Sequence, residues 1–118
     1  MASGTLHMRT HVDVDNQLGL RNLHEVLKIR EHFRDLVTIE IVAFPQSGIL
    51  RSPGTAELLD EAIAQGAALV GGLDPVGIDG DLDAHLDAVF AIAMTLLVLP
   101  LVALFLVARV FFPALASL

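Results

Sequence analysis

Two side chains that can bind metal ions or protons lie close together near the start of the chain. His11 and Asp13 belong to the run Leu6–Val14, in which apolar and polar residues alternate. This alternation predicts a β-strand that carries both side chains on one face. A catalytic metal site needs three or four ligands, usually drawn from several elements. The pair by itself therefore favours hydrogen bonding or solvation over direct metal ligation.

The polar face of this predicted strand also contains His7 and Arg9. Alternation alone is most typical of a sheet with one face in water, and that interpretation is favoured. A second interpretation stays open, in which the polar face lines the interior of a small (β/α) barrel near an active site.

A glutamine follows the second predicted strand. Thr38–Phe44 is rich in apolar and β-branched residues, which is typical of a strand buried on both faces. Pro45 and Gly48 end it, because neither suits a strand interior. Gln46 thus lies at the carboxyl end of a buried strand, where α/β proteins bind their ligands. Its amide can read the edge of a flat polar ring such as a pyrimidine; a turn residue facing water is the equal alternative.

The other polar residues predict no further catalytic group. Ser47 and Ser52 have no base at a recognisable spacing, so neither is expected to be a nucleophile. His24 and His32 fall on the outer face of a predicted helix. His85 is expected on an exposed helix face, beside the aspartates Asp81, Asp83 and Asp87.

Alternating strands and helices must position these residues. After the first strand we predict a helix over about Leu18–Arg34, capped by Asp15 and Asn16, and then the strand from Thr38. A second helix is predicted from an N-cap at Thr55 to a C-cap at Gly66. A strand over Ala67–Gly72 and a helix from about Leu82 follow. Strands about 30 residues apart with intervening helices predict parallel βαβ units. A closed (β/α)8 barrel takes about 250 residues. The chain therefore forms either a small open α/β sheet or a piece of a barrel.

Composition limits the partners and the compartment. The chain has 118 residues, a net charge of −7 and no cysteine. The negative charge argues against a nucleic-acid partner, and the missing thiols exclude disulfides and thiolate metal sites. The start of the chain lacks the basic and apolar regions of a signal peptide, so we expect a cytoplasmic location.

The carboxyl-terminal part has a different composition. Residues 88–108 contain no charged side chain, and this run is long enough to span a bilayer as a helix. Pro100 would kink it, which membrane spans tolerate. A C-terminal membrane anchor is one interpretation, and a segment that folds back onto the sheet or aggregates is the other. The open sheet edges of a barrel piece also predict self-association.

Three runs of residues together carry a family resemblance. They are Arg9–Val14 (RTHVDV), Ile41–Leu50 (IVAFPQSGIL) and Val70–Pro75 (VGGLDP). In this order and spacing, they resemble the cytosine-deaminase-like branch of the amidohydrolase superfamily, over about residues 4–93. Members of that family are (β/α)8-barrel hydrolases that use a divalent metal, iron or zinc, to deaminate cytosine or to hydrolyse related cyclic amides and amidines.

The resemblance implies roles for particular residues. It carries Gln46 over as a substrate-contacting residue, and it places His11 and Asp13 on the second barrel strand, lining the interior in supporting positions. It does not make them metal ligands, because the family's metal is held by residues that have no counterpart here. No catalytic or metal-binding residue is therefore assigned, and no cofactor is expected in this chain.

These observations predict two segments. Residues 1–93 are expected to be a partial amidohydrolase barrel of about three βα units, inactive alone, whose intact relatives act on a small pyrimidine-like substrate. Residues 94–118 are expected to be a hydrophobic tail, with a transmembrane helix over about 88–108. The abrupt change after Ala93 is typical of a shifted or truncated reading frame. The alternative is a small tail-anchored membrane protein with an α/β interaction domain.

Overall fold

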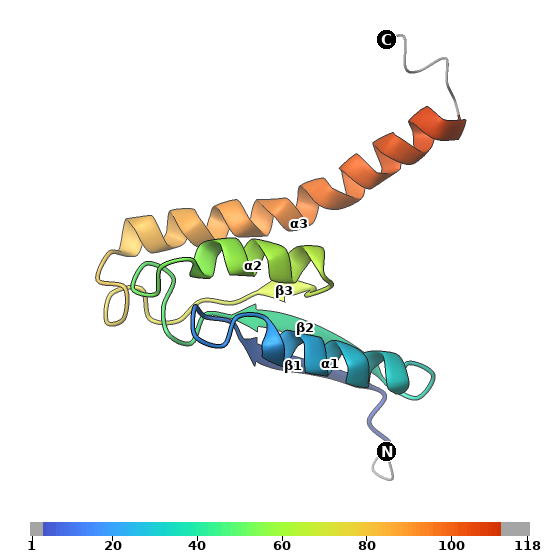
Figure 1. Ribbon diagram of the computed structural model, residues 1–118, viewed down its shortest axis with the longest axis horizontal. Helices are drawn as coiled ribbons and strands as arrows, with labels where there is room; N and C mark the ends of the chain where they lie inside the picture. The colour runs from blue at the N-terminus through green and yellow to red at the C-terminus, as the bar shows by residue number, and fades with distance from the viewer. Residues whose placement is uncertain (1–3, 112–118) are drawn as a thin grey trace.

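The computed structural model describes residues 4–111 and has three parallel strands flanked by three helices. The order along the sheet is β1–β2–β3, so β1 and β3 are its two edges (Figure 1). The elements are β1 (His7–Asp13), α1 (Arg21–His32), β2 (Thr38–Phe44), α2 (Thr55–Ala64), β3 (Leu69–Val70) and α3 (Leu82–Phe111). The predicted parallel βαβ arrangement is confirmed.

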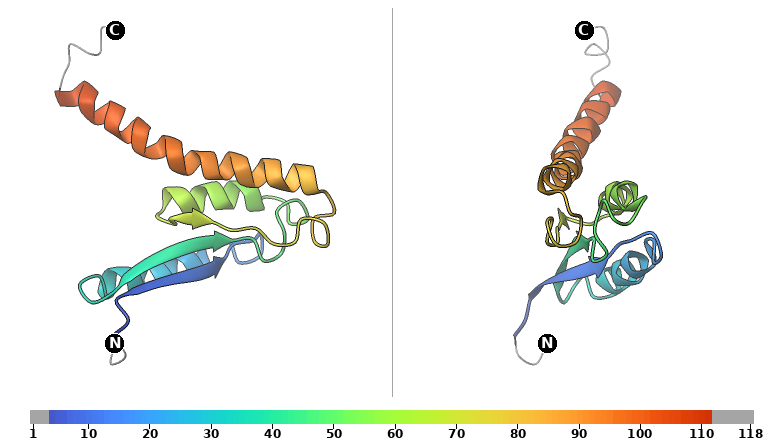
Figure 2. Two further views of the ribbon diagram at one scale, coloured as in Figure 1. Left: turned by 180° about the vertical axis from the view of Figure 1, so that it is seen from behind. Right: turned by 90° about the vertical axis from the view of Figure 1, so that its left-hand side faces the viewer.

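The sheet buries one face beneath its helices. Val12 of β1 and Ile41 and Ala43 of β2 have exposed fractions of 3%, 0% and 0%. α1 packs against β1 and β2, and α2 packs against β2 and β3, on the same side of the sheet (Figure 2). Burial of these apolar side chains stabilises the fold, and it fixes the register because a slip by one residue would expose them.

The first helix begins later than its sequence predicts. The expected start at Leu18 is wrong, since α1 begins at Arg21 and Leu20 caps it without a side-chain hydrogen bond. Asp15 instead accepts hydrogen bonds from the backbone N–H groups of Gln17 and Leu18. Gly19 has a φ of +58°, which interrupts helical geometry. A tight turn therefore satisfies the donors that a helix cap would have satisfied.

Two other boundaries also differ from the predictions. Gly54, with a φ of +87°, is the N-cap of α2, so Thr55 is its first helical residue and not the cap. The third strand is only Leu69–Val70, although the N–H of Gly71 still donates to Ala43 O at 2.9 Å. A Cβ on Gly71 would lie 2.5 Å from the Phe44 ring, so a side chain there would displace that ring.

α3 is one continuous helix across the change in composition at residues 93 and 94. Its first half packs against α2 and β3 through Ile92, which is 3% exposed. Beyond about Thr95 the helix extends past the end of the sheet (Figures 1 and 2), and Leu97, Leu101 and Leu104 are 64%, 65% and 65% exposed. Pro100 lies inside this extension.

Candidate functional site

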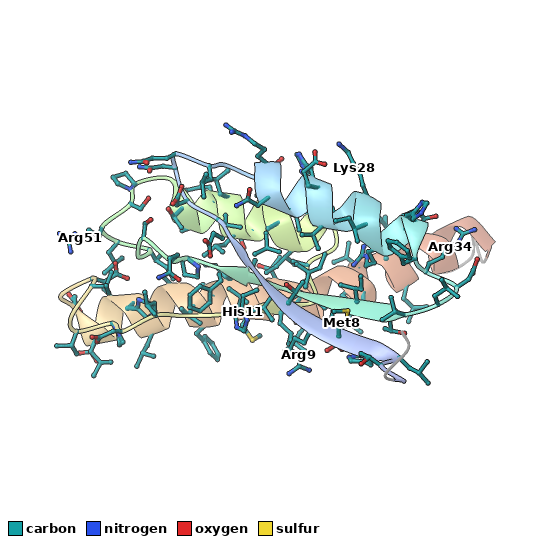
Figure 3. All side chains as sticks on the ribbon, turned by 90° about the horizontal axis from the view of Figure 1, so that it is seen from below. Met8, Arg9, His11, Lys28, Arg34 and Arg51 are labelled. Atoms are coloured by element: carbon teal, nitrogen blue, oxygen red, sulfur yellow. The ribbon has the colours of Figure 1, made fainter. Side chains whose placement is uncertain are left out.

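The polar face of β1 lies on the side of the sheet that the helices leave open. Figure 3 shows Arg9 and His11 pointing away from α1. The parallel register places Arg9 beside Glu40 and Asp13 beside Phe44. Within residues 4–111 this face is exposed at His7, Arg9 and His11 of β1, although Val42 of β2, in register with His11, is 5% exposed; the opposite face forms the core. The fold thus gathers these polar side chains on one surface, as the alternation predicts.

A network of charged side chains covers the amino-terminal half of this face. Arg9 Nε and Nη2 donate to Glu40 Oε2 at 3.0 and 2.8 Å, and His7 Nε2 lies 3.3 Å from the same oxygen. The hydrogen bond from Arg9, with a further one from His7, lowers the pKa of Glu40. These groups are largely exposed, so solvent screens the interaction and it adds little stability. The network shapes the face but offers no catalytic group.

The carboxyl-terminal half of the face contains the two predicted supporting residues. The ring of His11 packs edge to face against Phe44, with ring centroids 5.2 Å apart. Asp13, which is half-buried, pairs in register with Phe44. An aromatic ring, an imidazole and a carboxylate are therefore neighbours just before the strands end.

Gln46 lies two residues beyond Phe44, on a tight turn. The N–H of Gly48 donates to Pro45 O at 2.9 Å, which closes the turn around Gln46 and Ser47. Gln46 is exposed, and its amide group makes no hydrogen bond to another residue in the range 4–111. An exposed amide at the carboxyl end of parallel strands is free to bind a polar ligand.

Asp15, expected from the sequence only as a helix cap, holds this turn. Ser47 Oγ donates to Asp15 Oδ2 at 2.8 Å, and Asp15 is 7% exposed. Hydrogen bonds from the Leu18 N–H, Ser47 and the Gln17 N–H lower the pKa of Asp15, against the opposing effect of burial. The sequence contains one weak signal for the Ser47–Asp15 hydrogen bond, which is that Ser47 directly follows Gln46.

The expected exposed position of His85 is wrong. His85 is 3% exposed, and its Nδ1 lies 2.5 Å from Oδ2 of Asp79, whose side chain is fully buried. Burial raises the pKa of Asp79, but hydrogen bonds from His85 and from the backbone N–H groups of Arg51 and Ile49 outweigh it, so the net pKa is lowered. The prediction failed because His85 was compared only with the aspartates on its own helix, and not with the preceding loop.

The side chains present do not fit a catalytic metal ion. Among residues 4–111, no three His, Asp or Glu side chains gather closely enough to hold one. His11 and Asp13 give at most two ligands from one strand, whereas a catalytic zinc site takes three protein ligands. We derive no metal-dependent step from this chain.

An apolar groove of about 360 Å³ lies at the other end of the sheet, away from Gln46. It is lined by Thr5 and Met8, by Ile29 of α1 and its C-cap Phe33, and by Val37 and Ile39. It contains no titratable side chain, so it is unsuited to chemistry on a polar ring.

Part of α3 has the length and composition of a membrane span, and that part begins in the half of the helix that packs on the sheet domain. In the part of the chain that the structure describes, one helical stretch qualifies, Leu82–Leu104, in which an 18-residue window has a mean hydropathy of 2.3 and 6% of its residues buried. Its first turns are nevertheless occupied by the sheet domain, where Thr95 Oγ1 donates to Asp60 Oδ1 at 3.3 Å. The free apolar surface therefore starts later than residue 88.

Comparison with known proteins connects this geometry with a family. No family model matches the chain. It is 38% identical over 90 residues to an N-isopropylammelide isopropyl amidohydrolase of Pseudomonas sp. (strain ADP), which covers 76% of this chain and 22% of that protein. It is 39% identical over 93 residues to the uncharacterized protein YahJ of Escherichia coli (strain K12), which covers 79% of this chain and 20% of that one.

Solved structures give the same result in three dimensions. The crystal structure of N-isopropylammelide isopropylaminohydrolase from Burkholderia multivorans is 57% identical, with a TM-score of 0.77 over 79% of this chain and 24% of that one. That of 5-methylcytosine deaminase from Klebsiella pneumoniae, liganded with phosphonocytosine, is 35% identical, with a TM-score of 0.66 over 75% and 22%. The chain thus spans about a fifth to a quarter of the proteins it matches, and over about residues 4–93 it is homologous to the cytosine-deaminase-like amidohydrolases.

Proposed function

We propose that residues 4–93 are a segment of a (β/α)8-barrel amidohydrolase that contributes to binding a pyrimidine-like ring. The observation that carries this proposal is the exposed, unpaired amide of Gln46 at the carboxyl end of β2, within a segment 57% identical to a solved amidohydrolase. In the complete reaction, ring deamination, water adds to a ring carbon and ammonia leaves. Gln46 would hold the ring through one donated and one accepted hydrogen bond.

The surroundings of Gln46 support a flat polar ligand. Phe44 offers an aromatic surface at the same end of β2, and His11 and Asp13 offer hydrogen-bonding groups from the adjacent strand. In this proposal they line the interior of the barrel and do not ligate metal. Phosphonocytosine and 5-fluorocytosine are the ligands named for the related 5-methylcytosine deaminase, and they supply the probe for this chain.

The test is a fluorine NMR titration of 5-fluorocytosine with the full chain, kept soluble in a mild non-ionic detergent. We expect a saturable change in the fluorine signal, and we expect Gln46→Ala to weaken binding about tenfold, because two hydrogen bonds of about 0.5–1.5 kcal/mol each are lost. Gln65→Ala is the control for a glutamine truncated away from the site: Gln65 is also exposed but is the C-cap of α2 at the opposite end of the sheet, and its amide is hydrogen-bonded to His24 and Glu61. Equal effects of the two substitutions would contradict the proposal.

We further propose that the chain by itself does not deaminate such a ring. The support is the donor set, in which His11 and Asp13 do not complete a metal site within residues 4–111. Incubation with cytosine and added zinc or iron should release no ammonia above the rate of the buffer. Ammonia release that requires both the metal and the chain would overturn this part of the proposal.

A second candidate function is membrane attachment, which the exposed apolar half of α3 favours. In this proposal the second half of α3 inserts into a bilayer, and the sheet domain remains on the cytoplasmic side. The full chain should then float with phosphatidylcholine vesicles in a density gradient and resist extraction by high salt. Release by salt alone would contradict insertion, because burial of apolar surface does not depend on screened charge.

A further inference from the structure

The residues that follow Gln46 are hydrogen-bonded to a single buried carboxylate from another part of the chain. Asp79, in the loop between β3 and α3, has a fully buried side chain. Its Oδ1 accepts hydrogen bonds from the N–H groups of Leu50 and Arg51, and its Oδ2 accepts one from Ile49, all at 3.1 Å. Three backbone donors that converge on one charged acceptor fix three consecutive residues.

His85 holds that carboxylate in turn. The ring atom Nδ1 of His85 lies 2.5 Å from Asp79 Oδ2. The backbone N–H of His85 donates to Asp81 O, which fixes His85 in the first turn of α3. The ring packs closely on Gly72, where an added Cβ would lie 3.0 Å from Nε2. The position of the Asp79 carboxylate is thus set both by a helix and by the end of β3.

Gly48 connects this pair directly with the turn that contains Gln46. Gly48 has a φ of +86°, and a Cβ there would collide with Asp79 Oδ1. The turn Pro45–Gly48 therefore packs directly on Asp79, and only glycine satisfies both the backbone angle and the space. An unbroken series of contacts runs from α3 through His85 and Asp79 to the turn.

We infer that the Asp79–His85 pair positions Gln46 for ring binding, by holding the loop after β2 from the side of β3 while Asp15 and Ser47 hold it from the side of β1. This inference rests on the proposed function of Gln46. Asp79 and His85 touch no ligand in it, and they are positioning residues whose effect reaches the ring only through the loop.

The experiment combines a local readout with a binding readout on the full chain in non-ionic detergent. The local readout is amide hydrogen exchange at Ile49, Leu50 and Arg51. The reference amides are Val14 and Gly71, whose N–H groups donate to Phe44 O and Ala43 O at 2.9 Å within the sheet. The binding readout is the fluorine NMR titration with 5-fluorocytosine.

Asp79→Asn places an NH₂ donor against backbone donors, so at least one loop amide loses its acceptor. We expect exchange of the three loop amides to accelerate about tenfold or more, with the reference amides unchanged, and 5-fluorocytosine binding to weaken about tenfold. His85→Leu should do the same to a smaller degree. His85→Asn, whose amide can replace Nδ1, should restore both readouts, which a merely structural packing role would not require.

The outcomes separate this inference from the proposed function. If Gln46→Ala weakens binding but Asp79→Asn and His85→Leu bind as the native chain does, the positioning inference is wrong and the proposed function stands. If the native chain and Gln46→Ala do not differ, both fail. Should Asp79→Asn lose protection at Val14 and Gly71 as well, the comparison of His85→Leu with His85→Asn decides, because both keep the Asp79 carboxylate.

Discussion

The loops at the carboxyl end of the sheet and the second half of α3 are held in opposite ways. Around Gln46, the buried carboxylates of Asp15 and Asp79 accept hydrogen bonds from loops that are distant in sequence. Beyond Leu96, which still packs against the core, α3 presents Leu97, Leu101 and Leu104, which are about two-thirds exposed. One region is fixed by specific partners inside the chain, whereas the other is apolar surface without such partners.

The difference shows which part of the chain specifies its own structure. A buried carboxylate is stable only where donors surround it, so the loops around Gln46 define a single arrangement. An apolar helix with no polar face has no preferred partner, and it is stable in any environment that removes it from water. The candidate site is therefore a property of this chain, and the placement of the second half of α3 depends on its surroundings.

The largest expected effect is a loss of stability when a leucine of the core is truncated to alanine, compared with the same truncation of a leucine in the exposed half of α3. Leu59 of α2 is 0% exposed, and Leu97 of α3 is 64% exposed. Leu59→Ala should reduce the free energy of unfolding by about 2–5 kcal/mol, because it leaves a cavity. Leu97→Ala should change it by less than about 0.5 kcal/mol. Urea unfolding followed by circular dichroism measures both, and equal losses would show that the second half of α3 is packed.

A charge in the projecting helix should have the next largest effect, on partitioning into lipid. Leu101→Lys introduces a charge that costs about 2.5–3.5 kcal/mol near the middle of a membrane helix, so flotation with phosphatidylcholine vesicles should fall sharply. Val76→Lys is the matched control, since Val76 is 64% and Leu101 65% exposed, but Val76 lies in the loop before α3. Unchanged flotation of Leu101→Lys would argue against insertion of this part of α3.

Acid should loosen the two carboxylate-held loops. The pKa values of Asp15 and Asp79 are lowered by their hydrogen bonds, whereas an unfolded Asp titrates near about 3.9. The stability they contribute is therefore present above about pH 4 and is lost as the pH falls through the lower folded pKa values. The urea concentration at the midpoint of unfolding should therefore decrease when the pH is lowered below about 4.

Variants at the same residues sharpen this pH prediction. The double variant Asp15→Asn/Asp79→Asn should begin less stable and show a flatter pH dependence, because the linked groups are gone. Glu40→Gln is the control. The pKa of Glu40 is lowered by an exposed pair with Arg9, so this substitution should leave the dependence of stability on pH nearly native. A native slope in the double variant would show that other groups cause the acid sensitivity.

The smallest effect is expected where polar contacts are exposed. Lys28 Nζ lies 2.8 Å from Glu25 Oε1 on the outer side of α1 (Figure 3), with both side chains mostly in water. Lys28→Ala should leave the urea midpoint unchanged. Arg30→Ala on the same helix removes a part-buried hydrogen bond to Gly66 O and should cost about 1 kcal/mol. A reversed order would show that burial does not decide the strength of these contacts.

The sequence predicts much of the fold because the fold rests on local patterns. Alternation in Leu6–Val14 and the apolar run from Thr38 predict both main strands, and α3 begins at Leu82 as expected, where the Asp81 carboxylate accepts from the Ala84 N–H at 3.0 Å. The start of α1 was missed because Asp15 can satisfy either a helix or a turn, and Gly19 decides for the turn. Propensity alone does not rank two local solutions of similar energy.

The candidate site is predicted less completely. Gln46 and the shared face of His11 and Asp13 follow from position within a strand. The partners Asp79 and His85 do not, because the carboxylate meets backbone N–H groups about 30 residues away, and backbone donors leave no signal in side-chain spacing. Such contacts arise only when the loops of neighbouring βα units are brought together in three dimensions.

The unbroken course of α3 has a consequence for how a ligand would reach Gln46. The helix starts beside Asp79, at the Gln46 end of the sheet, and runs toward the opposite end before it projects. Residues 82–95, at 1.5 Å per residue, form a rigid spacer of about 20 Å. With the second half of α3 embedded in lipid, the turn at Gln46 would stand at the far side of the domain from the bilayer. Its ligand would then arrive by diffusion through water and not laterally from the lipid phase.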